Sequence, residues 1–207
     1  MISVSKAGDL ENVSRETFDR LKAFGSMLVK WNGAINLVAR GTVEDMWSRH
    51  FVDSAQILQF CPPSCDHWAD LGTGGGFPGL VIAILVRESR PDTRFTFVES
   101  DQRKAAFLRQ ASRETGANVT VLAERIELCP ALAANVVSAR ALAPLTTLCG
   151  YAARHCQAGG TAIFQKGASY SEELEDALKN WRFDHSLHPS QTDPAAVILS
   201  ITNLCRL

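Results

Sequence analysis

A dense run of glycines is the first place in this chain where chemistry is expected. Five glycines occur between Gly72 and Gly79, within the segment DLGTGGGFPGL at 70–80. Glycine allows backbone conformations and close approaches that a side chain forbids. The spacing Gly74-x-Gly76-x-x-Gly79 matches the fingerprint with which a loop cradles an adenosine-containing cofactor. The run therefore predicts a nucleoside site but leaves the identity of the cofactor open.

A carboxylate just before this loop favours one kind of cofactor. Asp70 stands two residues before Gly72, so its charge would repel a pyrophosphate. The same charge would attract the sulfonium and ammonium groups of S-adenosylmethionine (SAM). The loop also lacks the lysine, arginine or serine that a phosphate-binding loop uses. We therefore expect SAM, with a nicotinamide cofactor as the alternative, and count Asp70, Gly72, Gly74 and Gly76 as candidate cofactor-binding residues.

Two further side chains are candidates for the same site. Glu99 ends the next apolar run, and its two oxygens match the two hydroxyl groups of a ribose. A solvated acid at a strand end is the alternative interpretation of Glu99. Phe77 either packs against the cofactor or anchors the following helix in the core, and its position in the loop does not distinguish these roles.

The elements that must position these residues alternate regularly after residue 66. Apolar runs with the character of strands alternate with amphipathic or apolar helices, which is typical of a parallel sheet covered on both faces. The expected strands are 67–72, 93–99, 118–124, 135–140, 159–166, 181–188 and 193–203, and the expected helices are 78–88, 102–115, 144–156 and 171–181. The last two strands are expected to pair antiparallel.

Helical periodicity dominates the chain before this region. Residues 14–31 carry one apolar stripe, and Asn32-Gly33 is expected to end that helix. A second helix is expected from Thr42 to the Pro62-Pro63 turn, with Asp45 completing a capping box. The sequence thus predicts a Rossmann-like α/β domain at 62–207 with a helical N-terminal segment at 1–61.

Composition limits the class of protein further. The chain has 207 residues, is 46% hydrophobic and carries a formal net charge of -1, which argues against a protein that coats nucleic acid through a global basic field. It lacks an apolar run long enough for a membrane helix, and its start lacks the pattern of a signal peptide. We expect a cytoplasmic protein that does not contact a membrane. The six cysteines lack the spacing of a disulfide framework or a zinc site, so we expect reduced thiols and no metal.

Read together, several segments resemble one family. The chain is similar to the RsmG family, also called glucose-inhibited division protein B, from about residue 20 to its end. The segments that carry the resemblance are WNGAINLVARG (31–41), MWSRHFVDSAQIL (46–58), DLGTGGGFPGL (70–80), FVESDQRKAAFLRQ (97–110), AERIE (123–127), VVSARALAPL (136–145) and FQKG (164–167). The resemblance implies a class I SAM-dependent methyltransferase that modifies N7 of a guanine in 16S ribosomal RNA. It implies 16S rRNA or the 30S subunit as partner, and we expect a monomer.

The resemblance also assigns residues to the site. It implies that Gly72 and Phe77 touch SAM, that Ile126 and Glu127 frame the adenine, and that Arg140 lines the pocket near the methyl donor. Gly75 departs from the Ala or Pro that many members have there, and the sequence offers no physical reason for it. Val38 replaces a threonine that is frequent in the family, which leaves any hydroxyl role there in doubt.

Guanine N7 has a lone pair and no proton, so its attack on a methyl group needs no general base, and the useful residues are those that position the base. The candidates are Arg49, His50, Arg140 and Lys166; the last two follow parallel strands at the edge where ligands bind. Asp53 is expected to orient Arg49 or His50. A surface ion pair for Arg49 and a core or capping role for His50 remain alternatives. The alternative functions are a SAM-dependent methyltransferase of another nucleic acid or a small molecule, a small nicotinamide-dependent oxidoreductase, and a noncatalytic RNA- or ribosome-binding protein.

Four cations on the helix expected at 102–115 have two interpretations. Few acids accompany them, so they form either an ordinary solvated face or a contact with the RNA backbone, which would be strongly salt-dependent. These residues are Arg103, Lys104, Arg109 and Arg113.

Overall fold

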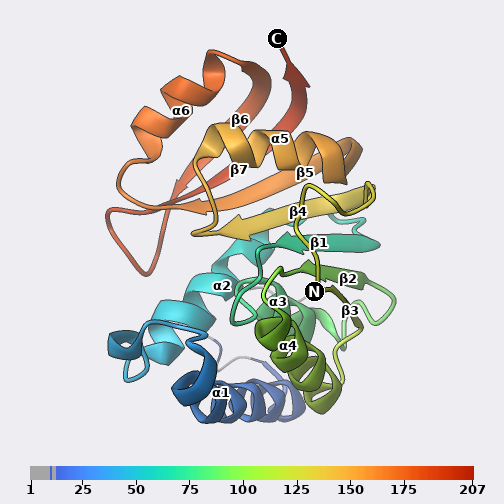
Figure 1. The fold of residues 1–207 in the computed structure, drawn as a ribbon, viewed down its shortest axis with the longest axis vertical. Coiled ribbons are helices and arrows are strands. Elements are labelled where there is room, and N and C mark those ends of the chain that lie inside the picture. The colour runs from blue at the N-terminus through green and yellow to red at the C-terminus, as the bar shows by residue number, and fades with distance from the viewer. Residues whose placement is uncertain (1–9, 11–12) are drawn as a thin grey trace.

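The computed structural model describes Leu10 and residues 13–207 as a sheet flanked by helices (Figure 1). The described strands form one seven-stranded sheet in the order β3-β2-β1-β4-β5-β7-β6. Their bounds are β1 His67–Leu71, β2 Arg94–Val98, β3 Val119–Leu122, β4 Ala134–Arg140, β5 Cys156–Lys166, β6 Trp181–Pro189 and β7 Val197–Arg206.

The strand directions confirm the predicted fold class. β1 pairs parallel with β2 and β4, and the parallel ladder continues outward to β3 and β5. β7 pairs antiparallel with both β5 and β6, so the C-terminal strand pair is antiparallel as expected. The order reverses beside β1, and the carboxyl ends of β1, β2 and β4 therefore open onto the crevice where α/β sheets bind ligands.

Helices cover both faces of this sheet, in agreement with the sequence prediction. Their bounds are α1 Arg15–Ile35, α2 Asp53–Ala55, α3 Gly79–Val86, α4 Gln102–Thr115, α5 Leu145–His155 and α6 Tyr170–Leu178. Strand side chains alternate between faces, and Trp68 belongs to the hydrophobic cluster that contains α1, α3 and α4. Its neighbour Ala69 belongs to the second cluster, with α5 and Ala177 of α6.

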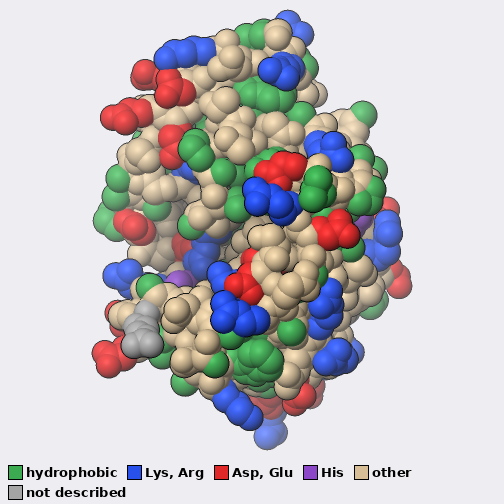
Figure 2. Space-filling view, in the orientation of Figure 1, with side chains coloured by type: hydrophobic (Ala, Val, Ile, Leu, Met, Phe, Trp, Pro, Cys, Tyr) green, Lys and Arg blue, Asp and Glu red, His purple; other side chains and the backbone are tan. Residues whose placement is uncertain are grey.

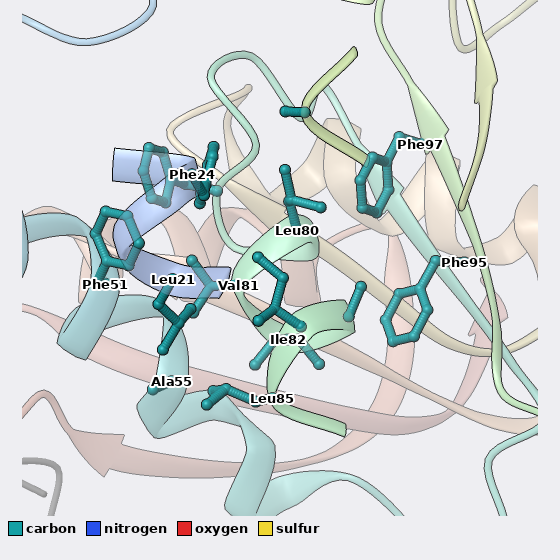
Figure 3. Close-up of a cluster of buried hydrophobic side chains, with 14 of the residues drawn as sticks. Leu21, Phe24, Phe51, Ala55, Leu80, Val81, Ile82, Leu85, Phe95 and Phe97 are labelled. Atoms are coloured by element: carbon teal, nitrogen blue, oxygen red, sulfur yellow. The ribbon is translucent and has the colours of Figure 1, made fainter. Parts of the chain in front are cut away.

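The N-terminal helical segment packs into the same core as the sheet. Leu21 and Phe24 of α1 and Phe51 of the helical stretch Trp47–Val52 lie on one side of α3, and Phe95 and Phe97 of β2 lie on the other (Figure 3). All eight residues of α3 are buried. Burying one such Phe or Leu side chain contributes about 1.5–3 kcal/mol. Because one hydrophobic cluster contains residues from both sides of residue 61, the division into 1–61 and 62–207 stays a prediction.

The first helix is longer than predicted. α1 continues through Asn32-Gly33 to Ile35, and Asn36 ends it with a left-handed backbone, φ 47°. Asn32 does not stop the helix because its side-chain oxygen accepts from the backbone N–H groups of Leu37 and Val38, at 2.7 and 2.9 Å. Asn32 therefore lies within the end of α1, and its side chain fixes the backbone of the two residues that follow Asn36.

The prediction of one regular second helix is wrong. Residues 40–60 form a succession of short helical stretches: η2 Arg40–Thr42, a π-helical η3 Trp47–Val52, α2, and a 3-10 helix η4 Gln56–Phe60. Thr42 does not cap a helix, since its hydroxyl donates to the Ala39 carbonyl at 2.7 Å. π-Helical turns shift the side chains that follow them and frequently occur at functional sites.

Among the described residues, no helix is both long and apolar enough to cross a membrane. Within the same part of the chain, no group of three or more His, Cys, Asp or Glu side chains is arranged to hold a metal ion. All six cysteines lie in the described region as free thiols.

Candidate active site

The loop between β1 and α3 is built from glycines with unusual backbones. Gly72, Gly74 and Gly76 have φ values of 64°, 56° and 97°, a region that other residues rarely adopt. The Gly72 amide donates to the Val98 carbonyl at 2.8 Å, which ties the loop to the end of β2. The predicted glycine loop is therefore present, at the carboxyl end of the central strand.

Asp70 lies under this loop rather than facing its open side. The side chain is fully buried, with one oxygen accepting from the Gly79 amide at 3.1 Å and the other from the Ser138 hydroxyl at 2.6 Å. Burial raises the pKa of Asp70 to about 6, against the effect of these hydrogen bonds. A Cβ at Gly79 would lie 2.7 Å from the carboxylate, so this glycine permits the contact.

This position corrects the reasoning from charge. Asp70 joins β1 to the start of α3 and to β4, and its carboxylate does not line the cavity above the loop. The sequence predicted that Asp70 attracts the sulfonium or ammonium group of SAM. The carboxylate does not face the cavity, so it cannot contact these groups there. Gly76 also lies outside the cavity lining, and a Cβ built there would lie 2.9 Å from Phe24 and 3.2 Å from Leu80.

Glu99 holds the loop from the end of β2. Its carboxylate accepts from the Gly74 amide at 2.9 Å and, with the other oxygen, from the Asp101 amide at 2.8 Å. Glu99 is 8% exposed and lines the cavity. Each carboxylate oxygen has a second lone pair, so the group can hold the loop and still accept from a ligand hydroxyl.

The first cavity, cavity 1, has a volume of about 650 Å³ and opens above the glycine loop. Figure 2 shows this face of the molecule hollowed, with basic, acidic and histidine side chains gathered near the hollow. Most predicted cofactor-binding residues lie in the cavity wall. Those are Gly72, Gly74, Phe77, Glu99, Ile126, Glu127 and Arg140.

The structure supplies a reason for Gly75. A Cβ built at this residue would lie 3.0 Å from the backbone oxygen of Leu37 and 3.3 Å from its side chain. Leu37 also lines cavity 1 and follows the end of α1. The missing side chain at Gly75 therefore lets the N-terminal segment close directly onto the glycine loop.

A second cavity, cavity 2, lies beside the first and contains all the predicted substrate-positioning residues. It has a volume of about 660 Å³ and is lined by Arg49, His50, Arg140 and Lys166 among others. His50, Arg140 and Ala141 line both cavities. Ligands bound in the two cavities would therefore both lie beside His50 and Arg140.

Arg140 is the centre of the wall between the cavities. Its guanidinium donates to the Asp53 carboxylate at 3.1 Å and to His50 Nδ1 at 3.1 Å. The same group lies 5.1 Å from the centre of the Phe77 ring, within the range of a cation–π contact. The pairing of Asp53 with Arg49 is thus wrong, since Arg140 is the partner and Arg49 pairs loosely with Asp45 at 4.0 Å.

The hydrogen bonds of His50 determine its tautomer. An arginine can only donate, so Nδ1 of His50 accepts from Arg140. The Thr42 hydroxyl gives its proton to Ala39, so it accepts from His50 Nε2–H at 2.9 Å. Burial, helped by the charge of Arg140, lowers the pKa of His50 to about 4. The imidazole is therefore neutral at pH 7 and positions Arg140.

Lys166 reaches cavity 2 but is already paired. Its ammonium lies 2.6 Å from the Glu173 carboxylate and donates to the Ala143 carbonyl at 3.1 Å. The side chain is 9% exposed. Of the four predicted positioning residues, Arg49 is the most exposed, at 62% of its side chain.

Some lining residues escaped the sequence analysis. Gln165 precedes Lys166 on β5 and donates to the Asp53 carboxylate at 2.7 Å. Tyr151 lines cavity 1, and Thr192 lines cavity 2 from the β6–β7 loop. Lys104, one of the four cations that the sequence placed on a solvated face or at the RNA backbone, lines cavity 1 as well. The strand-end position of Gln165 was a usable signal, whereas no pattern in the sequence marks Tyr151 or Thr192.

Cavity 1 fits an adenosyl cofactor. Gly74 lines the cavity, and a Cβ built there would make only an ordinary contact, 3.8 Å from the Gly72 carbonyl oxygen, so the loop leaves room at this residue. Glu99 offers acceptors for ribose hydroxyl groups. The apolar side chains of Val98, Ile126 and Leu142 line the part of the wall that suits a flat base. Sheet order, glycine loop and carboxylate together define the class of Rossmann-like, SAM-dependent methyltransferases.

Comparison with known proteins narrows this class. The profile of the family described as rRNA small subunit methyltransferase G (GidB) matches residues 17–194. A protein of that name from Ruegeria pomeroyi is 53% identical over 196 residues, 95% of this chain and 96% of its own length. Another from Parvibaculum lavamentivorans is 49% identical over 94% of this chain and 87% of its own. The chain belongs to the rRNA small subunit methyltransferase G family.

Solved structures agree on the fold. A variant of MtNAS in complex with S-adenosylmethionine aligns with a TM-score of 0.58 at 14% identity, over 90% of this chain and 75% of that one. A SAM-dependent O-methyltransferase from Thermotoga maritima aligns with a TM-score of 0.54 at 15% identity, over 75% and 66%. At such identities the likeness concerns the fold alone.

Proposed function

We propose that this chain transfers a methyl group from SAM to N7 of a guanine in 16S ribosomal RNA. The observation that carries the proposal is the wall that cavities 1 and 2 share, formed by His50, Arg140 and Ala141. A cofactor in cavity 1 and a base in cavity 2 would meet across this wall. The family to which the chain belongs names small-subunit ribosomal RNA as the target.

The chain's own residues divide between the two ligands. Gly72, Gly74 and Glu99 would hold the nucleoside of SAM, and Phe77 would support the opposite side of the loop. SAM, when bound, supplies an electrophilic methyl group on a sulfonium. Arg140 stands where it can donate to a guanine O6 in cavity 2, since its guanidinium has more donors than its partners use.

Positioning carries the chemistry in this proposal. N7 has no proton to lose, so none of the residues is needed as a general base. The neutral His50 agrees with this, because both ring nitrogens are used to hold Arg140 and Thr42. The nearby Asp53 offsets the charge of Arg140, which favours a base that becomes cationic on methylation.

The substrate test uses SAM with a labelled methyl group. Purified chain is incubated with naked 16S RNA and with 30S subunits, and methylated bases are mapped by mass spectrometry of nuclease fragments. Label at N7 of a guanine supports the proposal, and transfer to another atom or to no RNA contradicts it. Calorimetry distinguishes the cofactor, since binding of NAD without binding of SAM would also contradict it.

The proposal also covers the oligomeric state, the location and the form of the RNA substrate. We propose that the chain works as a monomer in the cytoplasm on 16S RNA, either alone or within the 30S subunit. The comparison of naked RNA with 30S subunits in the same assay decides between these substrates. Light scattering of the purified chain tests the monomer, with a dimer mass as the contradicting result.

A further inference from the structure

Three residues on one face of α5 hold the far wall of cavity 1. Tyr151, Arg154 and His155 are spaced i, i+3 and i+4, so they point from the helix in similar directions. Each donates a hydrogen bond to the segment 126–129 that follows β3. The proposed function does not assign a role to any of the three.

The contacts reach the main chain at two carbonyls. His155 Nε2 donates to the Ile126 carbonyl at 3.1 Å. Arg154 donates to the Cys129 carbonyl through Nε at 3.3 Å and Nη2 at 2.7 Å. The third contact joins side chains, with the Tyr151 hydroxyl donating to Glu127. The segment is thus tied to α5 at its start, middle and end.

The tied segment is a compact turn. The amides of Leu128 and Cys129 both donate to the Arg125 carbonyl, at 3.0 and 3.3 Å. Arg125, Ile126 and Glu127 line cavity 1 together with Tyr151. The turn is therefore held by its own hydrogen bonds where it forms part of the cavity wall.

His155 is an unusual residue to find in this position. It is fully buried, and among the described residues its Nδ1 has no hydrogen-bond partner. Leaving a buried polar atom unpaired costs free energy, so an apolar residue would serve better if only packing were required. The single useful polar group of His155 is the Nε2–H that holds Ile126.

We propose that Tyr151, Arg154 and His155 form a clamp on α5 that fixes the turn at 125–129 and thereby sets the affinity and base selectivity of the cofactor site. These are positioning residues, since Arg154 and His155 act through the main chain of the turn. The inference rests on the proposed function in one respect, that cavity 1 takes an adenosyl cofactor. Adenine and hypoxanthine exchange donor and acceptor on one edge, and backbone groups that the clamp holds in place can distinguish the two bases.

Calorimetry with two ligands tests the clamp. S-adenosylhomocysteine and its deaminated analogue, S-inosylhomocysteine, are titrated into the unchanged chain and into His155→Leu and Arg154→Met. Loss of one hydrogen bond to a fixed carbonyl is expected to weaken binding of the adenosyl ligand by about tenfold. Binding of the inosyl ligand is expected to change less, so the ratio of the two affinities falls. A change in packing alone would not alter this ratio.

Matched variants separate the loss of a hydrogen bond from the effect of unfolding. His155→Gln keeps a donor close to the position of Nε2 and is expected to restore most of the ratio. Arg154 is exposed, so Arg154→Met keeps the test valid if His155→Leu fails to fold. Thr147→Ala, at an exposed residue of α5 outside both cavities, is the control and is expected to bind as the unchanged chain does.

The outcomes separate the two proposals. Normal affinities and an unchanged ratio in folded Arg154→Met and His155→Leu would overturn the clamp alone. Failure of the unchanged chain to bind either ligand would overturn the cofactor assignment and the clamp with it. A reduced ratio in both variants, restored by His155→Gln, supports the clamp.

Discussion

The Arg140 guanidinium donates to the Asp53 carboxylate at 3.1 Å and so joins the end of β4 to the N-terminal helical segment. Asp53 also accepts from Gln165 at 2.7 Å and from the Thr192 hydroxyl at 2.7 Å. Its two oxygens thus collect donors from β4, β5 and the β6–β7 loop. A carboxylate with this many partners holds Arg140 in one orientation at the boundary of the two cavities.

Asp53→Asn is expected to lower kcat for RNA methylation by about tenfold or more, because the partly buried guanidinium of Arg140 loses its anionic partner. The amide keeps the shape of the side chain but turns one acceptor into a donor that faces other donors. We expect a smaller change in the Kd for SAM than in kcat, measured by calorimetry and by single-turnover transfer of labelled methyl groups. Asp45→Asn is the control, since Asp45 pairs only loosely with the exposed Arg49. Equal effects of the two variants would contradict the role of Asp53.

Glu99→Ala is expected to weaken SAM binding, because the ribose acceptors are lost. The Gly74 and Asp101 amides also lose their acceptor, so stability is expected to fall by about 1–3 kcal/mol. Glu99→Gln keeps one acceptor oxygen and is expected to be intermediate in both properties. Calorimetry with SAM and urea unfolding measure the two effects separately. An unchanged Kd in folded Glu99→Ala would remove Glu99 from the cofactor site.

Lys166→Ala is expected to reduce turnover by about tenfold while the Kd for SAM stays nearly constant, since Lys166 lines cavity 2 only. Its partner Glu173, at 2.6 Å, is then left without its cation. The double variant Lys166→Ala with Glu173→Gln is therefore expected to recover stability but not turnover. If SAM binding and turnover fell equally, Lys166 would belong to the cofactor site or to the fold.

The order of strands and helices was predictable because it depends on local patterns. The helix at Gln102–Thr115 has the predicted bounds, since Asp101 caps its start and Gly116 ends it with a left-handed backbone. The glycine loop after β1 and the place of Glu99 at the end of β2 also followed from position in the sequence. Each of these features follows from a few adjacent residues.

The contacts of the buried Asp70 and the partly buried Asp53 were not predictable in this way. Asp70 meets Ser138 and Gly79, and Asp53 meets Arg140, only after distant strands have paired. Helical spacing suggested Arg49 as the partner of Asp53, but an exposed pair at that spacing contributes little. The better partner comes from β4. The departures of 40–60 from a regular helix likewise depend on how that segment packs against the sheet domain.

Gly75→Ala is expected to destabilise the chain and weaken SAM binding, because its Cβ would press on the Leu37 backbone at 3.0 Å. The glycine loop and the segment after α1 would have to move apart. Gly33→Ala is the matched control, since Gly33 is an exposed helical residue whose Cβ would meet nothing within 4 Å. That variant is expected to stabilise the chain by about 1 kcal/mol. Thermal unfolding and SAM calorimetry measure both, and normal SAM binding by Gly75→Ala would contradict this account.

His50 is expected to make the chain less stable in acid. Its pKa is about 4 in the folded chain, compared with an ordinary value of 6.5. Between these values the unfolded chain binds a proton that the folded chain does not, so stability falls as the pH drops from 6.5 towards 4. His50→Asn keeps an acceptor for Arg140 but does not titrate. The difference in Tm between the unchanged chain and this variant is therefore expected to shrink as the pH is lowered through this range.

Asp70 titrates with the opposite sign, since its pKa rises from 3.8 to about 6 and its contribution is lost as the pH increases. Both proteins contain Asp70, so its effect cancels in the difference between their Tm values. The same holds for His67 and His155, whose pKa values burial also lowers. Thermal unfolding at half-unit steps from pH 4 to 8 measures the difference. A difference in Tm that stays constant with pH would mean that His50 binds a proton as readily in the folded chain as in the unfolded one. That result would contradict the hydrogen bonds of the neutral imidazole with Arg140 and Thr42.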